Sequence, residues 1–117
     1  MKVKVLSSGS KGNCSLILCD NIKLLIDIGL SCLKVQKHLE DNLLSFSDIS
    51  GLLISHSHSD HIKGLETFIK KTNIKVYIPK EMYHELESIV PVDRCVFIGD
   101  NFSIGDVNIE LIHTSHD

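Results

Sequence analysis

Residues 56–61, which read HSHSDH, constrain this chain more than any other stretch of its sequence. They follow an apolar run at residues 51–54 and precede an amphipathic segment that begins at Ile62, so we expect a loop that joins a buried strand to a helix. In a tight loop of this kind, four side chains with nitrogen or oxygen donor atoms can converge: His56, His58, Asp60 and His61.

This combination of side chains predicts a metal site. Imidazole nitrogens together with one carboxylate suit Zn²⁺, and also Mn²⁺ or Fe²⁺, because these borderline cations accept mixed nitrogen and oxygen ligands. The spacing differs from the helical metalloprotease motif, in which a glutamate lies between two histidines four residues apart. The alternative is a polar turn that only solvates the end of the strand. The density of donor side chains at a strand-to-helix junction favours the metal site.

The composition restricts the compartment more than the substrate. The 117 residues are 43% apolar, which is enough for an ordinary globular core, and the formal net charge of -3 gives no overall attraction to nucleic acid. The chain has no apolar run near the ~20 residues of a membrane helix and no signal peptide, so we expect a cytoplasmic protein without a membrane partner. Its four cysteines should be thiols that pack as small apolar residues.

Hydrophobic periodicity predicts a layered α/β architecture. The expected strands span residues 2–6, 14–19, 23–27, 51–54, 75–78, 95–98, 102–104 and 107–112, and the expected helices span residues 31–42, 61–71 and 80–90. Five lysines in the middle of the chain are either a solvated face or, if DNA binds, a set of phosphate contacts: Lys63, Lys70, Lys71, Lys75 and Lys80.

Four segments carry a resemblance to a known family: SSGSKGNCSLI at 7–17, LLIDIGLS at 24–31, LISHSHSDHIKGL at 53–65 and TSHD at 114–117. HSHSDH is similar to the H-x-H-x-D-H motif of the metallo-β-lactamase-fold hydrolases. Together, and in this order along the whole chain, the four segments resemble the YycJ/WalJ-type branch, whose members are bacterial cytoplasmic proteins described as DNA exonucleases.

The resemblance implies a site for one or two ions, Zn²⁺ or Mn²⁺, in the intact protein. Three histidines would hold the first ion: His56, His58 and His116. Asp60 and His61 would hold the second. Asp60 is also a candidate catalytic residue, because a carboxylate beside an activated water can orient that water.

Two assignments compete with alternatives. His113 also lies near the end of a predicted strand, but the family match falls on His116. Asp27 ends the strand at residues 23–27, and the resemblance implies that it supports a ligating histidine without binding a metal itself. From the residues alone, Asp27 could equally be part of a surface turn or a helix cap.

The resemblance implies half of a four-layer αββα sandwich. Residues 1–117 match the N-terminal half, whereas the family's bridging aspartate and last histidine would follow later in the chain. We therefore expect a truncated or split protein. An apolar sheet face left uncovered would favour a complementing C-terminal chain or self-association.

The expected activity is metal-dependent hydrolysis, in which an ion activates water near neutral pH. The resemblance implies a phosphodiesterase that acts on DNA as an exonuclease in its intact form. Because the same fold serves several hydrolytic reactions, a thioester or other small-molecule hydrolase is an alternative. A further alternative is an inactive metal-binding remnant, or a half-protein that works only with a partner chain.

Overall fold

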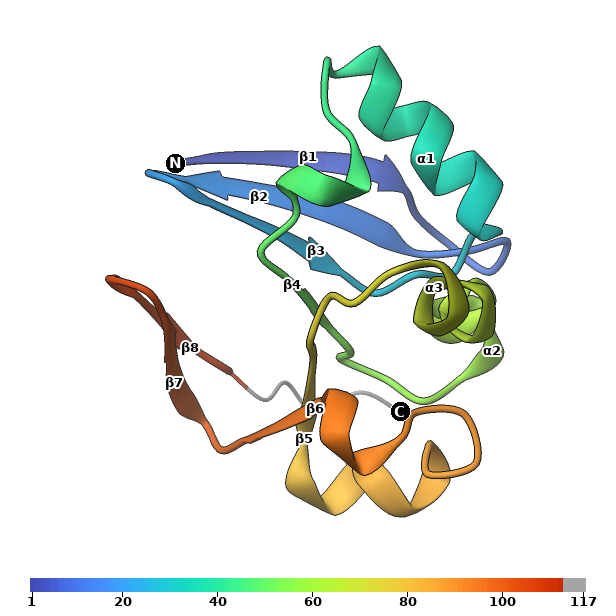
Figure 1. Ribbon diagram of the computed structural model, residues 1–117, viewed down its shortest axis with the longest axis vertical. Coiled ribbons are helices and arrows are strands. Elements are labelled where there is room, and N and C mark those ends of the chain that lie inside the picture. The colour runs from blue at the N-terminus through green and yellow to red at the C-terminus, as the bar shows by residue number, and fades with distance from the viewer. Residues whose placement is uncertain (113–117) are drawn as a thin grey trace.

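The computed structural model describes residues 1–112, in which six strands form one mixed sheet in the order β1-β2-β3-β4-β5-β6 (Figure 1). The first three strands form an antiparallel meander, and β3 to β6 run parallel to one another. The strands are β1 (Lys2–Ser7), β2 (Cys14–Cys19), β3 (Ile22–Ile26), β4 (Gly51–Leu53), β5 (Val76–Pro79) and β6 (Cys95–Ile98).

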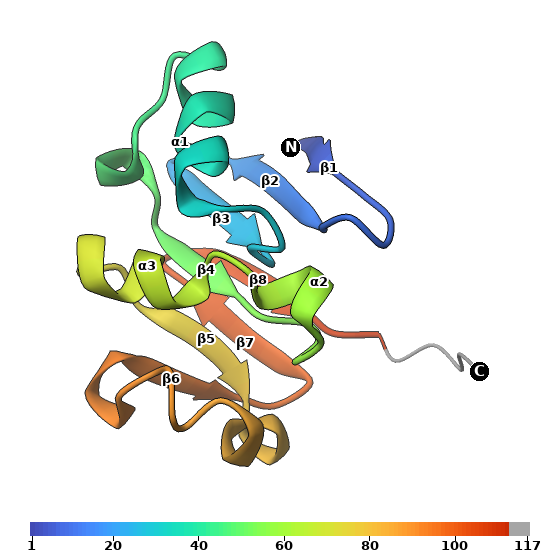
Figure 2. The ribbon, with the colours of Figure 1, turned by 90° about the vertical axis from the view of Figure 1, so that its right-hand side faces the viewer.

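Three α-helices cover one face of this sheet (Figure 2): α1 (Cys32–Asp41), α2 (Ser59–Ile62) and α3 (Leu65–Lys71). Ser31 caps the first helix, because its hydroxyl accepts a hydrogen bond of 3.3 Å from the Lys34 amide. Short 3-10 helices lie in the connections, at Phe46–Asp48, Lys80–Glu85 and Val92–Arg94. Within residues 1–112, no helix has the length and apolar character needed to cross a bilayer.

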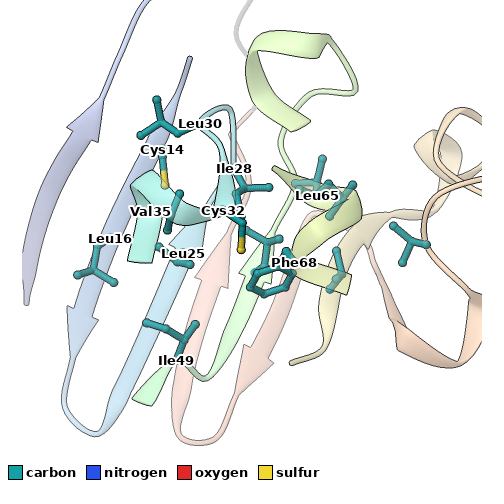
Figure 3. Close-up of a cluster of buried hydrophobic side chains, with 14 of the residues drawn as sticks. Cys14, Leu16, Leu25, Ile28, Leu30, Cys32, Val35, Ile49, Leu65 and Phe68 are labelled. Carbon is teal, nitrogen blue, oxygen red and sulfur yellow. The ribbon is translucent and has the colours of Figure 1, made fainter. Parts of the chain in front are cut away.

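The main core lies between the sheet and these helices (Figure 3). Directly paired residues on neighbouring strands point to the same face of a sheet. One such row crosses four strands and is fully buried: Leu16, Leu25, Leu52 and Val76. Phe68 of α3, also fully buried, belongs to the same cluster. Each large side chain buried in this way contributes about 1.5–3 kcal/mol, so this layer fixes the sheet beneath the helices.

A hairpin of β7 (Asn101–Ile104) and β8 (Val107–Glu110) packs on the opposite face of the sheet (Figure 1). Its Phe102 ring stacks on Tyr77 with a centroid distance of 5.7 Å. The sheet face that was expected to be uncovered is therefore partly covered. At the sheet edge, most of β1 is exposed, with Val3 and Val5 56% and 63% accessible.

The prediction of a single helix at residues 61–71 is wrong, because the chain forms two helices separated at Gly64. In a continuous helix, the Gly64 amide would donate to the Asp60 carbonyl. Instead it donates to the Ile28 carbonyl at 2.8 Å, and the Asp60 carbonyl accepts from the Asn13 amide at 2.7 Å. Hydrogen bonds to distant loops thus replace the helical ladder, and this is the reason for the break.

The prediction of a regular helix at residues 80–90 is also wrong. The structure has a 3-10 helix at Lys80–Glu85 followed by turns. The Leu86 amide donates to the Tyr83 carbonyl three residues earlier, and the Tyr83 hydroxyl donates to the Val90 carbonyl at 2.8 Å. Leu86 and Val90 are both fully buried, so anchoring in the core and this side-chain bond replace a regular helix.

Gly64→Ala should destabilise the fold by about 2–3 kcal/mol, because overpacking against a fixed backbone forces the chain to move. An added Cβ at this position would lie 2.3 Å from the Leu30 carbonyl oxygen. Gly99→Ala is the matched control, since its Cβ would meet no atom within 4 Å. Urea unfolding of both variants measures the difference, and equal midpoints would contradict this packing account.

Candidate metal centre

Three loops meet at one edge of the sheet. They are residues 8–13 between β1 and β2, residues 27–31 between β3 and α1, and residues 54–58 between β4 and α2. Because β3 and β4 are parallel, the loops that follow them leave from the same edge, and β2 begins at that edge because it runs antiparallel to β3. The topology therefore gathers residues that are far apart in the sequence.

Backbone hydrogen bonds hold these loops together. The Asn13 amide donates to the Asp60 carbonyl at 2.7 Å, and the Gly29 amide donates to the Asn13 carbonyl at 2.8 Å. The Ile28 amide donates to the His61 carbonyl, also at 2.8 Å. This approach requires glycine at position 29, where a Cβ would lie 1.9 Å from the Asp60 carbonyl oxygen.

The Asp27 carboxylate lies beneath the HSHSDH loop and is only 4% exposed. It accepts a hydrogen bond of 2.7 Å from the Ser55 amide and a second bond from the Ser55 hydroxyl. Its Oδ2 also lies 2.7 Å from Nδ1 of His61. Asp27 has a left-handed backbone conformation (φ 63°), which aspartate tolerates better than most residues.

These contacts assign the protons of two imidazoles. A carboxylate oxygen accepts hydrogen bonds, so Nδ1 of His61 is the donor in this contact, and in the neutral imidazole the lone pair lies on Nε2. The Ser55 hydroxyl gives its single proton to Asp27, so the 2.8 Å contact between this hydroxyl and His56 requires a proton on Nδ1 of His56. In the neutral form of both histidines, Nε2 is therefore the nitrogen that can bind a metal.

Asp60 lies near the other ring nitrogen of His61, with 3.8 Å between Asp60 Oδ2 and His61 Nε2. The Asn13 side-chain amide donates to Asp60 Oδ2 at 3.2 Å and lies 3.4 Å from His61 Nε2. Sequence reasoning missed Asn13 and Ser55 as site residues. Asn13 falls within the SSGSKGN segment and Ser55 directly precedes HSHSDH, but only the meeting of the loops reveals their contacts.

The structure brings some of the predicted residues together and leaves others apart. One donor atom from each of Asp27, His56 and His61 lies within 4.8 Å of the other two. The ring centroids of His56 and His61 are 4.5 Å apart, whereas those of His56 and His58 are 6.4 Å apart. His58 is exposed at the N-cap of α2. His113 and His116 lie outside the described residues.

The donor set fits a borderline divalent cation, because two imidazole Nε2 atoms and a nearby carboxylate match the preferences of Zn²⁺ and Mn²⁺. Thiolate ligation does not fit. Cys14 is buried, and burial followed by the negative charge of Asp27 raises the pKa of its thiol to about 12. All four cysteines are free thiols, as expected, although only Cys14 and Cys32 are fully buried.

Solved structures identify the class of fold. The subclass B3 metallo-β-lactamase BJP-1 of Bradyrhizobium japonicum aligns with a TM-score of 0.70 and 22% identity, over 84% of this chain and 44% of that one. The BLEG-1 B3 metallo-β-lactamase aligns with a TM-score of 0.72 and 19% identity, over 97% of this chain and 62% of that one. The chain thus has the metallo-β-lactamase fold, as the sequence predicted.

Sequence comparison defines the family within this fold. The family profile described as Anti-Pycsar protein Apyc1 matches residues 6–92, and the chain belongs to this family. Exodeoxyribonuclease YycJ of Bacillus anthracis is 37% identical over 97% of this chain and 45% of its own length. Exodeoxyribonuclease WalJ of Streptococcus pneumoniae is 32% identical over 99% of this chain and 46% of its own length.

The resemblance to the YycJ/WalJ-type branch is therefore confirmed. An Anti-Pycsar protein Apyc1 of Paenibacillus xerothermodurans is more distant, at 26% identity over 74% of this chain. The chain spans about half the length of the curated relatives it matches.

Ser55→Ala should weaken metal binding about tenfold, because supporting contacts of this kind are worth about 10–100-fold in affinity. The substitution removes the hydroxyl that fixes the His56 tautomer but leaves the Asp27–His61 contact. Competition with a chromophoric zinc chelator measures the affinity. Ser47→Ala, at an exposed position in the 3-10 helix at Phe46–Asp48, is the matched control. Equal affinities for the two variants would show that the Ser55 hydroxyl does not hold the ligand.

The stability of the chain should decrease at alkaline pH because of Cys14. Folding raises the pKa of this thiol from 9.0 to about 12, so above pH 9.0 the unfolded state releases the proton and the folded state retains it. Relative to Cys14→Ala, the free energy of unfolding should fall by about 1 kcal/mol per pH unit in this range. Urea unfolding across a pH series tests this expectation, and a constant difference between the proteins would contradict it.

Proposed function

We propose that this chain carries the metal-binding part of a metal-dependent hydrolase that cleaves phosphodiester bonds at DNA ends. The observation that carries the proposal is the Asp27 network, which orients the His61 imidazole directly and the His56 imidazole through Ser55, with Asp60 Oδ2 3.8 Å from His61 Nε2. The substrate class rests on the relatives named exodeoxyribonuclease, which are 37% and 32% identical across nearly the whole chain.

The proposed ligands follow the family pattern. His56, His58 and His116 would hold one ion, and Asp60 and His61 would hold a second. Asp27 would support these ligands without binding metal itself, since its carboxylate accepts hydrogen bonds from Ser55 and contacts Nδ1 of His61. Zn²⁺ or Mn²⁺, when bound, supplies an activated water and a positive charge beside the leaving oxygen.

The residues of this chain then position the reactants. Asp60 would accept a hydrogen bond from the attacking water at a carboxylate oxygen and so orient it toward phosphorus. Asn13 holds that carboxylate in place through its side-chain amide. Asp27 would orient the His61 imidazole directly and the His56 imidazole through the Ser55 hydroxyl. We place this activity in the cytoplasm.

The remaining ligands of an intact site would come from outside these 117 residues, because the chain matches less than half of the length of its exodeoxyribonuclease relatives. A complementing C-terminal segment or chain is the partner that this proposal requires. A second candidate function is the one named by the family profile, Anti-Pycsar protein Apyc1, which matches residues 6–92. We rank it second because relatives of that name cover less of this chain, with 26% identity over 74% of it and 36% identity over 58% of it.

His58→Ala should lower both bound metal and nucleotide release from a DNA end, each by about 100-fold, because a direct ligand counts for more than a supporting contact. Metal per chain is measured by mass spectrometry, and nucleotide release is measured on an end-labelled duplex with and without the complementing C-terminal segment. His84→Ala, at an exposed position on a 3-10 helix, is the matched control.

Two results would contradict the proposal. Unchanged metal content in His58→Ala would remove His58 from the ligand set. Full activity of the 117 residues by themselves would show that no further ligands are needed. Absence of nucleotide release by the complemented wild-type protein with metal bound would favour the second candidate function.

A further inference from the structure

A groove of about 940 Å³ lies beside the metal loop and shares Asp60 with it. Three lysines line this groove, each from a different part of the fold: Lys11 from the β1–β2 loop, Lys34 from the first turn of α1, and Lys63 from the link between α2 and α3. The backbone bonds that close the metal site also bring these parts together.

The three ammonium groups have no acidic partner within residues 1–112. The two carboxylates in the groove are otherwise engaged, since Glu66 pairs with Lys70 at 3.3 Å and Asp60 faces Asn13 and His61. What distinguishes these lysines is their position, because three separate parts of the fold bring them to one groove beside the metal loop. This concentration of positive charge points to a negatively charged ligand.

Uncharged hydrogen-bond donors also make the groove suitable for an anionic ligand. The hydroxyl groups of Ser10, Ser57 and Ser59 also line the groove and make no hydrogen bond to any described residue. The backbone amides of Ser10 and Lys11 are likewise free of partners in residues 1–112. Ammonium, hydroxyl and backbone amide groups are the donors that proteins use to contact phosphate oxygens.

Few large apolar side chains line the groove. Its large apolar side chains are Ile62 and Ile89, and none of the residues in the described part of the chain that line it is aromatic. An acyl chain would need more apolar surface, and stacked bases would need aromatic platforms. Contacts to a sugar-phosphate backbone need neither, so the lining favours a ligand recognised through its phosphates.

We propose that this groove binds successive phosphates of a polynucleotide strand whose end lies at the metal loop. Lys11, Lys34 and Lys63 are the phosphate-contacting residues, and binding is independent of base sequence. The inference rests on the proposed function and adds the path of the substrate to it. Of the five lysines singled out in the sequence, only Lys63 lines the groove. Lys70 pairs with Glu66, and Lys75 donates to the Asp93 carbonyl.

The test measures binding separately from catalysis. Fluorescence anisotropy with a labelled single-stranded oligodeoxynucleotide, in the presence of EDTA, gives the affinity of the full chain at several salt concentrations. The variant K11Q/K34Q/K63Q should bind about 10–100-fold more weakly at low salt, and the slope of log affinity against log salt should decrease by about 2. The control K2Q/K37Q/K71Q removes the same charge from exposed positions outside the groove and should stay within about threefold of wild type.

Equal losses in the two triple variants would overturn the proposal, because the effect would then come from net charge alone. Competition by a deoxynucleoside monophosphate as strong as that by the unlabelled oligonucleotide would also overturn it in favour of a small phosphorylated ligand. A dependence of affinity on base sequence would contradict recognition through the backbone. Failure of the proposed function would look different, because the wild type would bind the strand but release no nucleotides with metal present.

Discussion

The buried carboxylate of Asp27 is the group on which the metal loop depends. A carboxylate without partners in this position would cost several kcal/mol, and the hydrogen bonds from Ser55 and His61 offset that cost. The same bonds determine which nitrogen carries the proton in His56 and in His61. The position of Asp27 at the end of a central strand therefore determines three things: the burial of its carboxylate, and the protonation and the orientation of the two imidazoles.

Much of the fold follows from local patterns in the sequence. The alternation of side chains and the turn residues locate the strands of the meander, and the cap at Ser31 locates the start of α1. The break at Gly64 could not be predicted, because its amide bonds to Ile28, which is 36 positions earlier in the sequence. A local pattern indicates which conformation a segment favours, but not which distant carbonyl will compete for its amides.

In the candidate site, too, the sequence predicted some features, whereas others depend on contacts between distant residues. HSHSDH identified the donor side chains because metal chemistry selects residue types, and residue types are visible in a sequence. Asn13 and Ser55 were not identified, since their part in the site is to hold other side chains. The contact between Asn13 and Asp60 spans 47 positions, and only the paired strands bring the two residues together. The same scaffold places three lysines beside the donor groups.

The backbone hydrogen bonds between the loops have a consequence for the order in which the protein folds. During synthesis, the ribosome releases the HSHSDH segment well after Asn13 and Gly29, and Gly64 emerges only a few residues later. A nascent chain that ends before Gly64 has the donor side chains but lacks one of the bonds that close the loops. A site able to bind metal should therefore form late and cooperatively during folding. A short peptide with the HSHSDH sequence should bind ions poorly, because nothing preorganises its imidazoles.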